Sequence, residues 1–345
     1  MSQSEVTREG LKGTRPGREA LTGVHAGRRR GRRRGEQPVV PPATSTSYYG
    51  KPVINSPVWS SPDIPGYLFL GGLAGASSLL GAGAQLTGRP ALAKTAKAGA
   101  LAAAGLSLAG LVHDLGRPAR FVNMLRIFKV TSPMSVGSWI LSGYVPAAWA
   151  AGLSAVTGRA PRIGAAATTA AAVLGPALAS YTAALISDTA VPAWHNGYPE
   201  MPFVFVGSAA TAAGGLGLLG APVSQNAPAR NLALLGTCTE LAAFQRMTRR
   251  IGMVAEPYHS GRAGAYIKAS EALSALGLAG ALLGRRSRLA SAVSGAALVA
   301  TSAATRWGIF HAGLTSADDP KYTVVPQREQ LTNRAQADGH PERPQ

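Results

Sequence analysis

Charged side chains are scarce in most of this 345-residue chain. The whole sequence is 14% charged, whereas soluble domains carry about a quarter. Between Pro65 and His311 the chain has only 19 basic and six acidic residues. A water-soluble fold of that size exposes too much surface to be covered by so few charges. This region is therefore expected to face lipid.

Cysteine is almost missing, since Cys238 is the single example. One thiol cannot hold an iron–sulfur cluster or a structural zinc ion, and it cannot form a disulfide within the chain. Nucleotide-binding loops, zinc-ligand spacings and nucleophile elbows are also absent from the sequence. These absences argue against a soluble enzyme and predict that the chain itself holds no metal.

Histidine is rare as well, and its placement bears on haem. A cytochrome b anchor needs histidines that face each other across a helical bundle as axial ligands. The six histidines are His25, His113, His195, His259, His311 and His340. Only His113 and His311 touch apolar stretches, and both are predicted to lie at helix ends on one face. We therefore expect no haem.

The sequence does contain eight apolar stretches, each near the roughly 20 residues that cross a bilayer as a helix. They cover approximately residues 65–86, 93–113, 135–156, 163–186, 201–220, 229–248, 265–284 and 289–311. Small residues are frequent in them, as in Gly71–Gly75 and Gly214–Gly217, and let helix backbones approach closely in lipid. We predict an all-α, polytopic integral membrane protein built as a bundle of eight transmembrane helices.

Both ends of the chain are polar. Residues 1–47 are rich in arginine, which is typical of a disordered tail. Contact with anionic lipid headgroups and simple solvation are both open interpretations of this tail. Residues 312–345 form a polar C-terminal tail. Because the net charge of +18 lies in the tails and short loops, it indicates a membrane protein, and no nucleic-acid partner is expected.

Three connections between the apolar stretches are longer and more polar than the others. They cover residues 114–134, 187–200 and 249–264. Each follows an even-numbered stretch, so all three should lie on one face with both tails, and a partner is expected to dock there. The loops of the two faces hold nearly equal numbers of basic residues. Only the tails therefore favour one orientation, in which both termini are cytoplasmic. We expect the protein to lie in the plasma membrane.

The most informative segment joins the second and third stretches. It reads HDLGRPARF from His113 onward and TSPMSVGSW from Thr131 onward. Between the two motifs, Phe121, Leu125 and Phe128 have helical spacing and predict an amphipathic helix over 121–129. The spacing alone leaves two interpretations open, either interfacial charges beside a connecting helix or a functional site.

The sequence resembles the NrfD/polysulfide-reductase membrane-subunit family. The resemblance rests on these two motifs, on the segments YYGKPV from Tyr48 and PVW from Pro57, and on the eight stretches. The resemblance spans residues 48–311 as one membrane domain and is most specific up to about residue 140. It implies a haem-free anchor that binds quinone, either menaquinone or ubiquinone. Such an anchor exchanges electrons with an iron–sulfur subunit carrying four clusters, which joins a molybdopterin or tungstopterin catalytic subunit. Formate dehydrogenase-like, polysulfide, tetrathionate, sulfite-type and nitrite-linked systems use such anchors, so the substrate stays open.

The chemistry of quinone points to residues at the end of the second stretch. A quinone headgroup needs hydrogen-bond partners for two carbonyl oxygens and proton donors that reload from water. An interfacial histidine beside a carboxylate can supply both. We therefore predict that His113 and Asp114 are the reactive pair and that Arg117 lies in the same site.

The resemblance implies a pocket among the first helices. Trp59, Asp63 and Tyr67 enter the first stretch with helical spacing and are expected to form the opposite wall of that pocket. The alternative for Trp59 and Tyr67 is an interfacial aromatic anchor. The alternative for Asp63 is a helix N-cap.

Charged residues deep in the predicted spans give a second signal. Glu240, Lys268, Glu271 and Arg306 lie inside apolar stretches, where an unpaired charge costs several kcal/mol. With Asp188 at the end of the fourth stretch, they could form a proton relay. Structural ion pairs between helices are the alternative, and Lys268 and Glu271 have the spacing for such a pair.

A secondary transporter or proton channel without a redox partner is the rival function. It would need a central polar cavity. The sequence shows no clear internal repeat, which weighs against a transporter built from inverted repeats. Co-purification with cluster-bearing subunits distinguishes the anchor from this rival.

Overall fold

The computed structural model describes residues 5–7, 10–12, 53–117, 119–283 and 285–337. The chain separates into two units, Met1–Thr44 and Ser45–Gln345.

The first unit contains two short strands, β1 (Glu5–Thr7) and β2 (Gly10–Lys12). They form an antiparallel pair in which Val6 lies opposite Leu11. The rest of the Arg-rich segment 1–47, which the sequence predicts to be disordered, lies outside the described residues.

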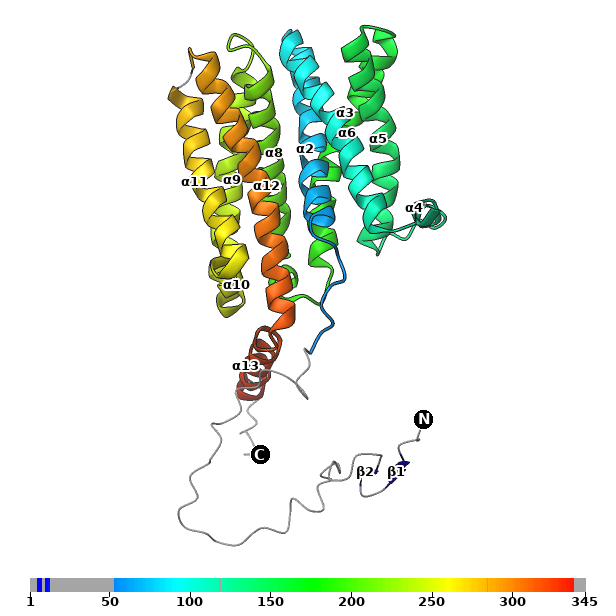
Figure 1. The fold of residues 1–345 in the computed structure, drawn as a ribbon, viewed down its shortest axis with the longest axis vertical. Helices are drawn as coiled ribbons and strands as arrows, with labels where there is room; N and C mark the ends of the chain where they lie inside the picture. The colour runs from blue at the N-terminus through cyan, green and yellow to red at the C-terminus, as the bar shows by residue number, and fades with distance from the viewer. Residues whose placement is uncertain (1–4, 8–9, 13–52, 118, 284, 338–345) are drawn as a thin grey trace. The chain divides into compact units, whose positions relative to one another are not determined.

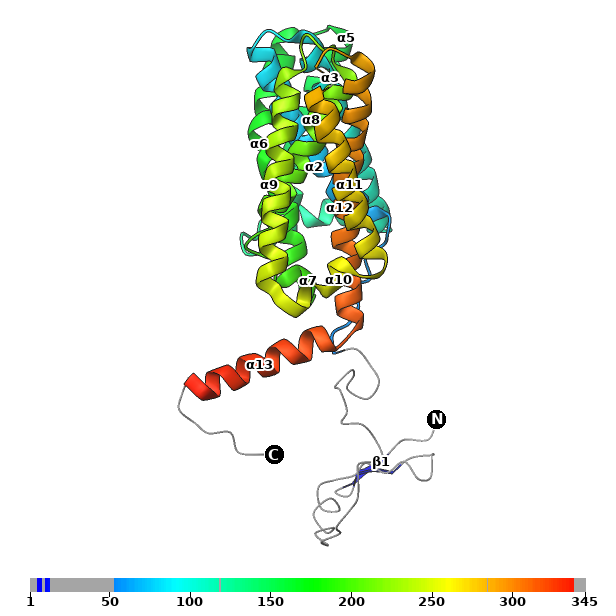
Figure 2. The same ribbon diagram turned by 90° about the vertical axis from the view of Figure 1, so that its left-hand side faces the viewer.

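The second unit is a bundle of long helices (Figures 1 and 2). In its described part, eight long helices fall on the eight apolar stretches: α2 (Asp63–Leu86), α3 (Pro90–Asp114), α5 (Pro133–Thr157), α6 (Pro161–Ser187), α8 (Met201–Gly220), α9 (Ala227–Ile251), α11 (Gly261–Leu283) and α12 (Arg288–Asp318). Five of them, α2, α3, α5, α6 and α8, are long and apolar enough to cross a membrane. The helical membrane fold is confirmed, whereas the count of eight crossings stays a prediction.

Several helices begin where sequence signals place them. Pro90, Pro133 and Pro161 open α3, α5 and α6, at positions where the missing N–H of proline has no intrahelical partner to lose. The Ser132 side chain caps α5 by accepting a hydrogen bond of 3.4 Å from a backbone N–H of the first turn. Gly158 ends α5 in the left-handed region, with φ 72°, which favours glycine.

Small residues allow the helices to pack backbone against backbone. Gly75 on α2 and Gly175 on α6 face each other so closely that a Cβ atom on either would overlap the other's carbonyl oxygen. Gly215 on α8 packs against the carbonyl of Gly295 on α12 in the same way. Because the lipid gives little hydrophobic drive for helix association, such contacts hold the bundle together by close packing.

The three long connections lie at the end of the bundle where α2 begins and α12 ends (Figures 1 and 2). They contain the short helices α4 (Ala119–Met124), α7 (Pro192–His195), η1 (Gly252–Ala255) and α10 (Glu256–His259). The predicted amphipathic helix over 121–129 is wrong in its extent. Helix α4 ends at Met124, so Leu125 and Phe128 follow it in an irregular segment that leads to the Ser132 cap.

The last long helix runs further than expected. The eighth stretch was predicted to end at 311, but α12 continues to Asp318. Gly313, in the extra turns, packs directly against the ring of the buried Trp194, so packing against α7 prolongs the helix. His311 is therefore inside a helix and not at its end. A further helix, α13 (Lys321–Ala337), lies in the polar C-terminal segment.

Candidate functional site: a cavity at the ends of α2, α3, α5 and α6

A cavity of about 130 Å³ lies among the first four long helices, at the end of the bundle that carries the long connections. Most of its lining is aliphatic or aromatic. The lining residues are Trp59, Ile64, Tyr67, Leu68, Leu111, Asp114, Leu115, Met124, Met134, Ser138, Leu141, Tyr181, Leu185 and Ile186. Three of the six residues predicted to bind quinone, Trp59, Tyr67 and Asp114, are thus brought together.

Trp59 forms one wall and is held by a second tryptophan. Its ring stacks on Trp194 of α7, with ring centroids 5.5 Å apart and an interplanar angle of 22°. Trp194 is fully buried, and its indole Nε1 donates a hydrogen bond of 2.8 Å to the carbonyl of Ile309 on α12. The wall is therefore fixed to a distant part of the chain, which restricts its motion and the entry of water.

Asp114 is the acidic group of the cavity. It is the last residue of α3, and its Oδ1 accepts a hydrogen bond of 3.1 Å from the backbone N–H of Ser60. This bond ties the segment before α2 to the end of α3. Within the described residues, Oδ2 has no hydrogen-bond partner, so this oxygen is available to a ligand.

His113 does not line the cavity, although it precedes Asp114 in the sequence. Its Nδ1 lies 2.8 Å from Oδ2 of Asp63, and the exposed fractions of the two side chains are 79% and 16%. Successive residues of an α-helix point about 100° apart, which turns His113 to the outside while Asp114 faces the cavity. The predicted reactive pair is therefore split between two environments.

Asp63 and Arg117 also lie outside the cavity lining. Asp63 is the first residue of α2 and follows the N-cap position, which Pro62 occupies, so the N-cap alternative is wrong. The helix dipole of α2 favours the negative carboxylate of Asp63 in its first turn, and that of α3 favours a positive His113 in its last turn. Arg117 is exposed in the turn after α3.

Sequence reasoning missed several cavity residues, of which Tyr181 on α6 is the most polar. Tyr181 is the single aromatic residue in the stretch 163–186, and this isolation could have marked it. Met134 and Ser138 lie within the TSPMSVGSW motif, which could have marked them, whereas Met124 carries no such signal.

A second cavity of about 580 Å³ lies beside the first and shares Tyr181 with it. Its titratable lining residues are Asp188, His195 and Tyr198. Asp188 is the exposed C-cap residue of α6, and the Nδ1 of His195 lies 3.1 Å from the carbonyl of Ser187. This cavity places polar, water-accessible groups next to the wall of the first.

The deep charges occupy two separate environments. Glu240 on α9 and Arg306 on α12 are buried, with 4% and 1% exposed. The Thr305 hydroxyl donates a hydrogen bond of 2.6 Å to Oε1 of Glu240, and Nη2 of Arg306 donates one of 2.8 Å to the Phe205 carbonyl.

Lys268 and Glu271, in contrast, are exposed on α11. Among the described residues, no ion pair joins the two side chains. The structure thus separates the two exposed charges from the buried ones.

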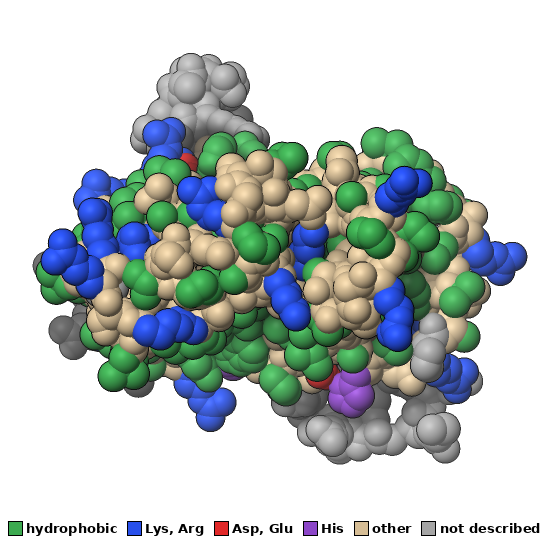
Figure 3. All heavy atoms as spheres, turned by 90° about the horizontal axis from the view of Figure 1, so that it is seen from above, with side chains coloured by type: hydrophobic (Ala, Val, Ile, Leu, Met, Phe, Trp, Pro, Cys, Tyr) green, Lys and Arg blue, Asp and Glu red, His purple; other side chains and the backbone are tan. Residues whose placement is uncertain are grey.

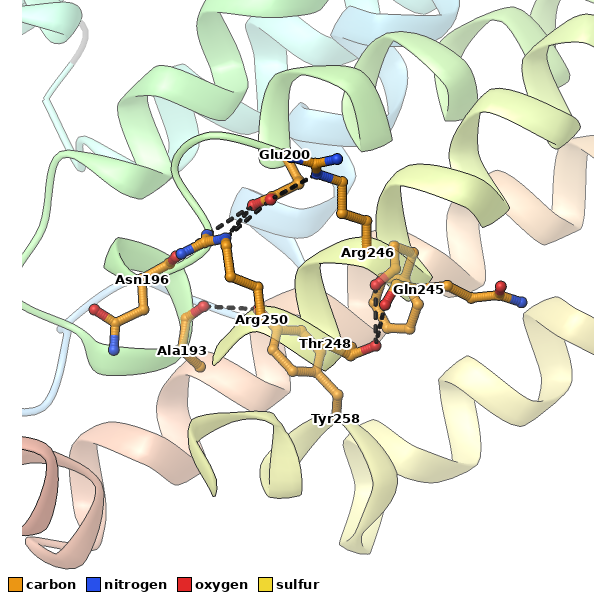
Figure 4. A network of polar contacts seen from close by, with 9 residues as sticks. Ala193, Asn196, Glu200, Gln245, Arg246, Thr248, Arg250 and Tyr258 are labelled. Atoms are coloured by element: carbon orange, nitrogen blue, oxygen red, sulfur yellow. Dashed lines mark hydrogen bonds and ion pairs between the residues drawn. The ribbon is translucent and has the colours of Figure 1, made fainter. Parts of the chain in front are cut away.

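The end of the bundle around the cavities is braced by an ionic network (Figure 4). Glu200, just before α8, accepts hydrogen bonds from Nε and Nη2 of Arg250, the shortest at 2.7 Å, and lies 3.5 Å from Nε of Arg246. The Arg250 guanidinium beside it holds the pKa of Glu200 below its ordinary value. The Tyr258 hydroxyl donates a hydrogen bond of 2.9 Å to the Ala193 carbonyl on α7. Nη2 of Arg250 also donates one to the carbonyl of Asn196, the C-cap of α7, so α7, α8, α9 and α10 are linked.

The residues that the structure describes include no group of three His, Cys, Asp or Glu side chains able to hold a metal ion. The absence of haem and metal from the purified chain stays a prediction.

The fold defines a multi-pass helical membrane protein with a small cavity at one end of the bundle. Residues 52–222 match the family described as polysulphide reductase, NrfD. No curated protein matches the chain. The matched region contains the whole lining of both cavities, and over it the chain belongs to the NrfD family. Members are membrane subunits of oxidoreductase complexes that interact with quinone, typically together with iron–sulfur and molybdopterin subunits.

Proposed function

We propose that the cavity lined by Trp59, Tyr67 and Asp114 binds the headgroup of a quinone. The observation that carries the proposal is a ring-sized space with apolar walls and one free carboxylate oxygen. A cavity of about 150 Å³ holds a benzene ring in a protein core, so about 130 Å³ suits one six-membered ring. The residues present therefore fit the oxygen-bearing ring of the group that the family implies, a ring that menaquinone and ubiquinone share.

A quinone supplies two carbonyl oxygens that take up or release protons as the ring gains or loses two electrons. Asp114 is placed to hold a proton at Oδ2 and to exchange it with a ligand oxygen. Tyr181 and Tyr67 can orient the ligand through their hydroxyls, and the stacked Trp59 excludes water from one side. General acid–base groups of this kind act only within hydrogen-bond reach, and the shared lining of Asp114, Tyr67 and Tyr181 supports such an arrangement.

Proton supply is assigned to the second cavity. Asp188 and His195 line it, are open to water, and lie across Tyr181 from Asp114. The exposed His113 with its partner Asp63 is a second route to the end of α3. In this scheme His113 acts on the site through Asp63 and the segment before α2, while Asp114 contacts the ligand.

The proposed complex contains a four-cluster iron–sulfur subunit and a molybdopterin or tungstopterin catalytic subunit, of which formate dehydrogenase-like systems are one form. The single Cys238 leaves this chain without a cluster, so electrons must be exchanged with a partner. The end formed by α4, α7 and α10 surrounds the cavities and is the proposed docking face. We place the complex in the plasma membrane with both termini cytoplasmic.

A transporter or channel without a redox partner is the second candidate. It would require the buried charges to line a water-filled path. Glu240 is instead 4% exposed and hydrogen-bonded by Thr305, which favours the anchor function.

Asp114→Asn in the assembled complex tests the proposal. Asparagine keeps the size of the side chain but cannot exchange a proton, so quinone-coupled turnover should fall by about 100-fold or more. Reduction or oxidation of a soluble dye should persist, because that path bypasses the membrane cavity. Asp319→Asn, beyond α12 and outside the cavity, is the matched control. Full quinone-coupled turnover per assembled Asp114→Asn complex would refute the site.

A further inference from the structure

The end of the bundle opposite the quinone cavity is strongly basic. Its short turns, over 87–92, 157–163, 220–228 and 284–290, contain no acidic residue. Nine basic residues lie in or near these turns: Arg89, Lys94, Lys97, Arg159, Arg162, Arg230, Arg285, Arg286 and Arg288. Figure 3 shows this end of the molecule from above, with Lys and Arg side chains spread across it. Such a surface attracts anions at the membrane interface.

Three of these cations share one cavity of about 350 Å³, between the turn that joins α2 to α3 and the last turns of α5. Its lining residues are Gln85, Gly88, Arg89, Pro90, Ala93, Lys94, Lys97 and Ala155. No carboxylate belongs to this lining. The cavity is therefore a concave site with three positive charges and one amide.

Lys97 is the unusual member of this set, because it is only 8% exposed. Its ammonium donates a hydrogen bond to the side-chain oxygen of Gln85. An ammonium carries three donors, and within the described residues no carboxylate lies within ion-pair distance of it. A buried cation without a counter-ion is costly, and an anion in the cavity would remove that cost.

The cavity lies near the end of the bundle, beside the turn that joins α2 to α3. Lys97 is seven residues from the first residue of α3, which is about 10 Å along the helix axis. Below the cavity, α5 exposes Trp149 and Leu153, and Gly152 brings α5 into backbone contact with the Lys97 carbonyl. Exposed apolar side chains thus lie within two turns of Ala155, the α5 residue that lines the cavity.

We propose that this cavity binds the phosphate of an anionic phospholipid, whose acyl chains cover the apolar surface at Trp149 and Leu153. A phosphate group satisfies the unpaired donors of Lys97 and is accessible to Lys94 and Arg89. Three cations with no lining carboxylate favour a lipid of net negative charge over a zwitterionic one. The adjoining apolar surface favours a lipid over free phosphate, which carries the same anionic chemistry.

Native mass spectrometry of the delipidated full-length chain tests this site, with phosphatidylglycerol, phosphatidylcholine and inorganic phosphate as separate probes. The double variant Arg89→Gln/Lys94→Gln removes two charges from the cavity rim, where folding does not depend on them. It should weaken phosphatidylglycerol binding by about tenfold or more. The matched control Arg159→Gln/Arg162→Gln removes two charges from the same end but outside the cavity, and should change binding less than about twofold.

Lys97→Gln should weaken phosphatidylglycerol binding further if the variant folds. If it does not fold, the rim variant and its control still decide the question. Equal binding of phosphatidylglycerol and phosphatidylcholine, or equal losses in the rim variant and its control, would overturn the site. Binding of inorganic phosphate as tight as that of phosphatidylglycerol would assign the cavity to a soluble anion and overturn the lipid assignment.

Discussion

Gly137 on α5 lies directly against the aromatic ring of Tyr181 on α6, so closely that a Cβ atom at position 137 would overlap the ring. Gly137 belongs to the TSPMSVGSW motif, and Tyr181 lines both the proposed quinone cavity and the second cavity. One function of the motif is therefore to leave space for the tyrosine that separates the two cavities.

Gly137→Ala should displace the Tyr181 ring and lower quinone-coupled turnover by up to about 100-fold, because a shift of about 1 Å in a site can have that effect. Dye-linked activity should be unchanged. Gly143→Ala is the matched control, since a Cβ there would meet only the flexible end of Leu174 at 3.3 Å. Equal quinone-coupled turnover in the two variants, per assembled complex, would show that the position of Tyr181 does not matter.

The helices of this protein were predictable because their signals are local. Each of the eight apolar stretches is long, and Pro90, Pro133 and Pro161 mark helix starts by their own backbone chemistry. The end of α12 was not predictable, because its extra turns depend on contact between Gly313 and Trp194, which are far apart in the sequence.

Three of the six residues predicted for the site line the candidate cavity, and the reason is similar. Trp59, Tyr67 and Asp114 were found from their positions at the ends of the first two stretches. The sequence could not show that His113 turns away from Asp114, because that depends on how α3 is rotated against α2. Tyr181 was marked only by being the single aromatic residue of its stretch, because α6 meets the cavity through tertiary packing.

His113→Gln separates a positioning role of His113 from a catalytic one. Glutamine can still hydrogen-bond to Asp63, but it cannot carry a proton as histidine does. If His113 supplies protons, we expect quinone-coupled turnover to fall by about tenfold or more and its pH profile to change, with complex assembly intact. An unchanged rate and pH profile in His113→Gln would limit His113 to holding the ends of α2 and α3 together. In that case His113→Ala should lower only the amount of assembled complex.

The ion pair of Glu200 with Arg250 gives a stability that depends on pH. Arg250 lowers the pKa of Glu200, so the pair stabilises the fold above the ordinary pKa of glutamate, about 4.3, and the effect is lost as pH falls toward the lowered value. Arg250→Gln should lower the free energy of unfolding by about 1 to 2 kcal/mol at neutral pH. The difference in the free energy of unfolding between Arg250→Gln and wild type should shrink below about pH 4.

Thermal unfolding in detergent between pH 3.5 and pH 7 measures this difference. The neighbouring Arg249→Gln is the matched control, because Arg249 is exposed and forms no ion pair within the described residues. A deficit of Arg250→Gln that stays constant with pH would contradict the assignment.

A chain of hydroxyls connects the buried Glu240 to α11. Thr305 donates a hydrogen bond of 2.6 Å to Glu240, and its oxygen lies 2.7 Å from the Ser270 hydroxyl. Ser270 directly precedes the exposed Glu271 in the sequence. This geometry supports the proposal that the deep carboxylate takes part in a proton relay that reaches the surface of α11.

Thr305→Val breaks this chain and tests the relay. The variant should abolish turnover-linked proton movement across proteoliposome membranes while quinone-coupled electron transfer continues, because the cavity at the ends of α2 and α3 is untouched. Thr301→Val, one turn earlier on α12 and equally buried, bonds only to the Ala297 carbonyl at 3.0 Å and is the control. Valine at 305 also leaves Glu240 without its shortest donor, at a cost of about 1 to 3 kcal/mol, so rates are compared per assembled complex. The same ratio of protons to electrons in both variants, or no turnover-linked proton movement in the wild type, would leave Glu240 and Arg306 with a structural role alone.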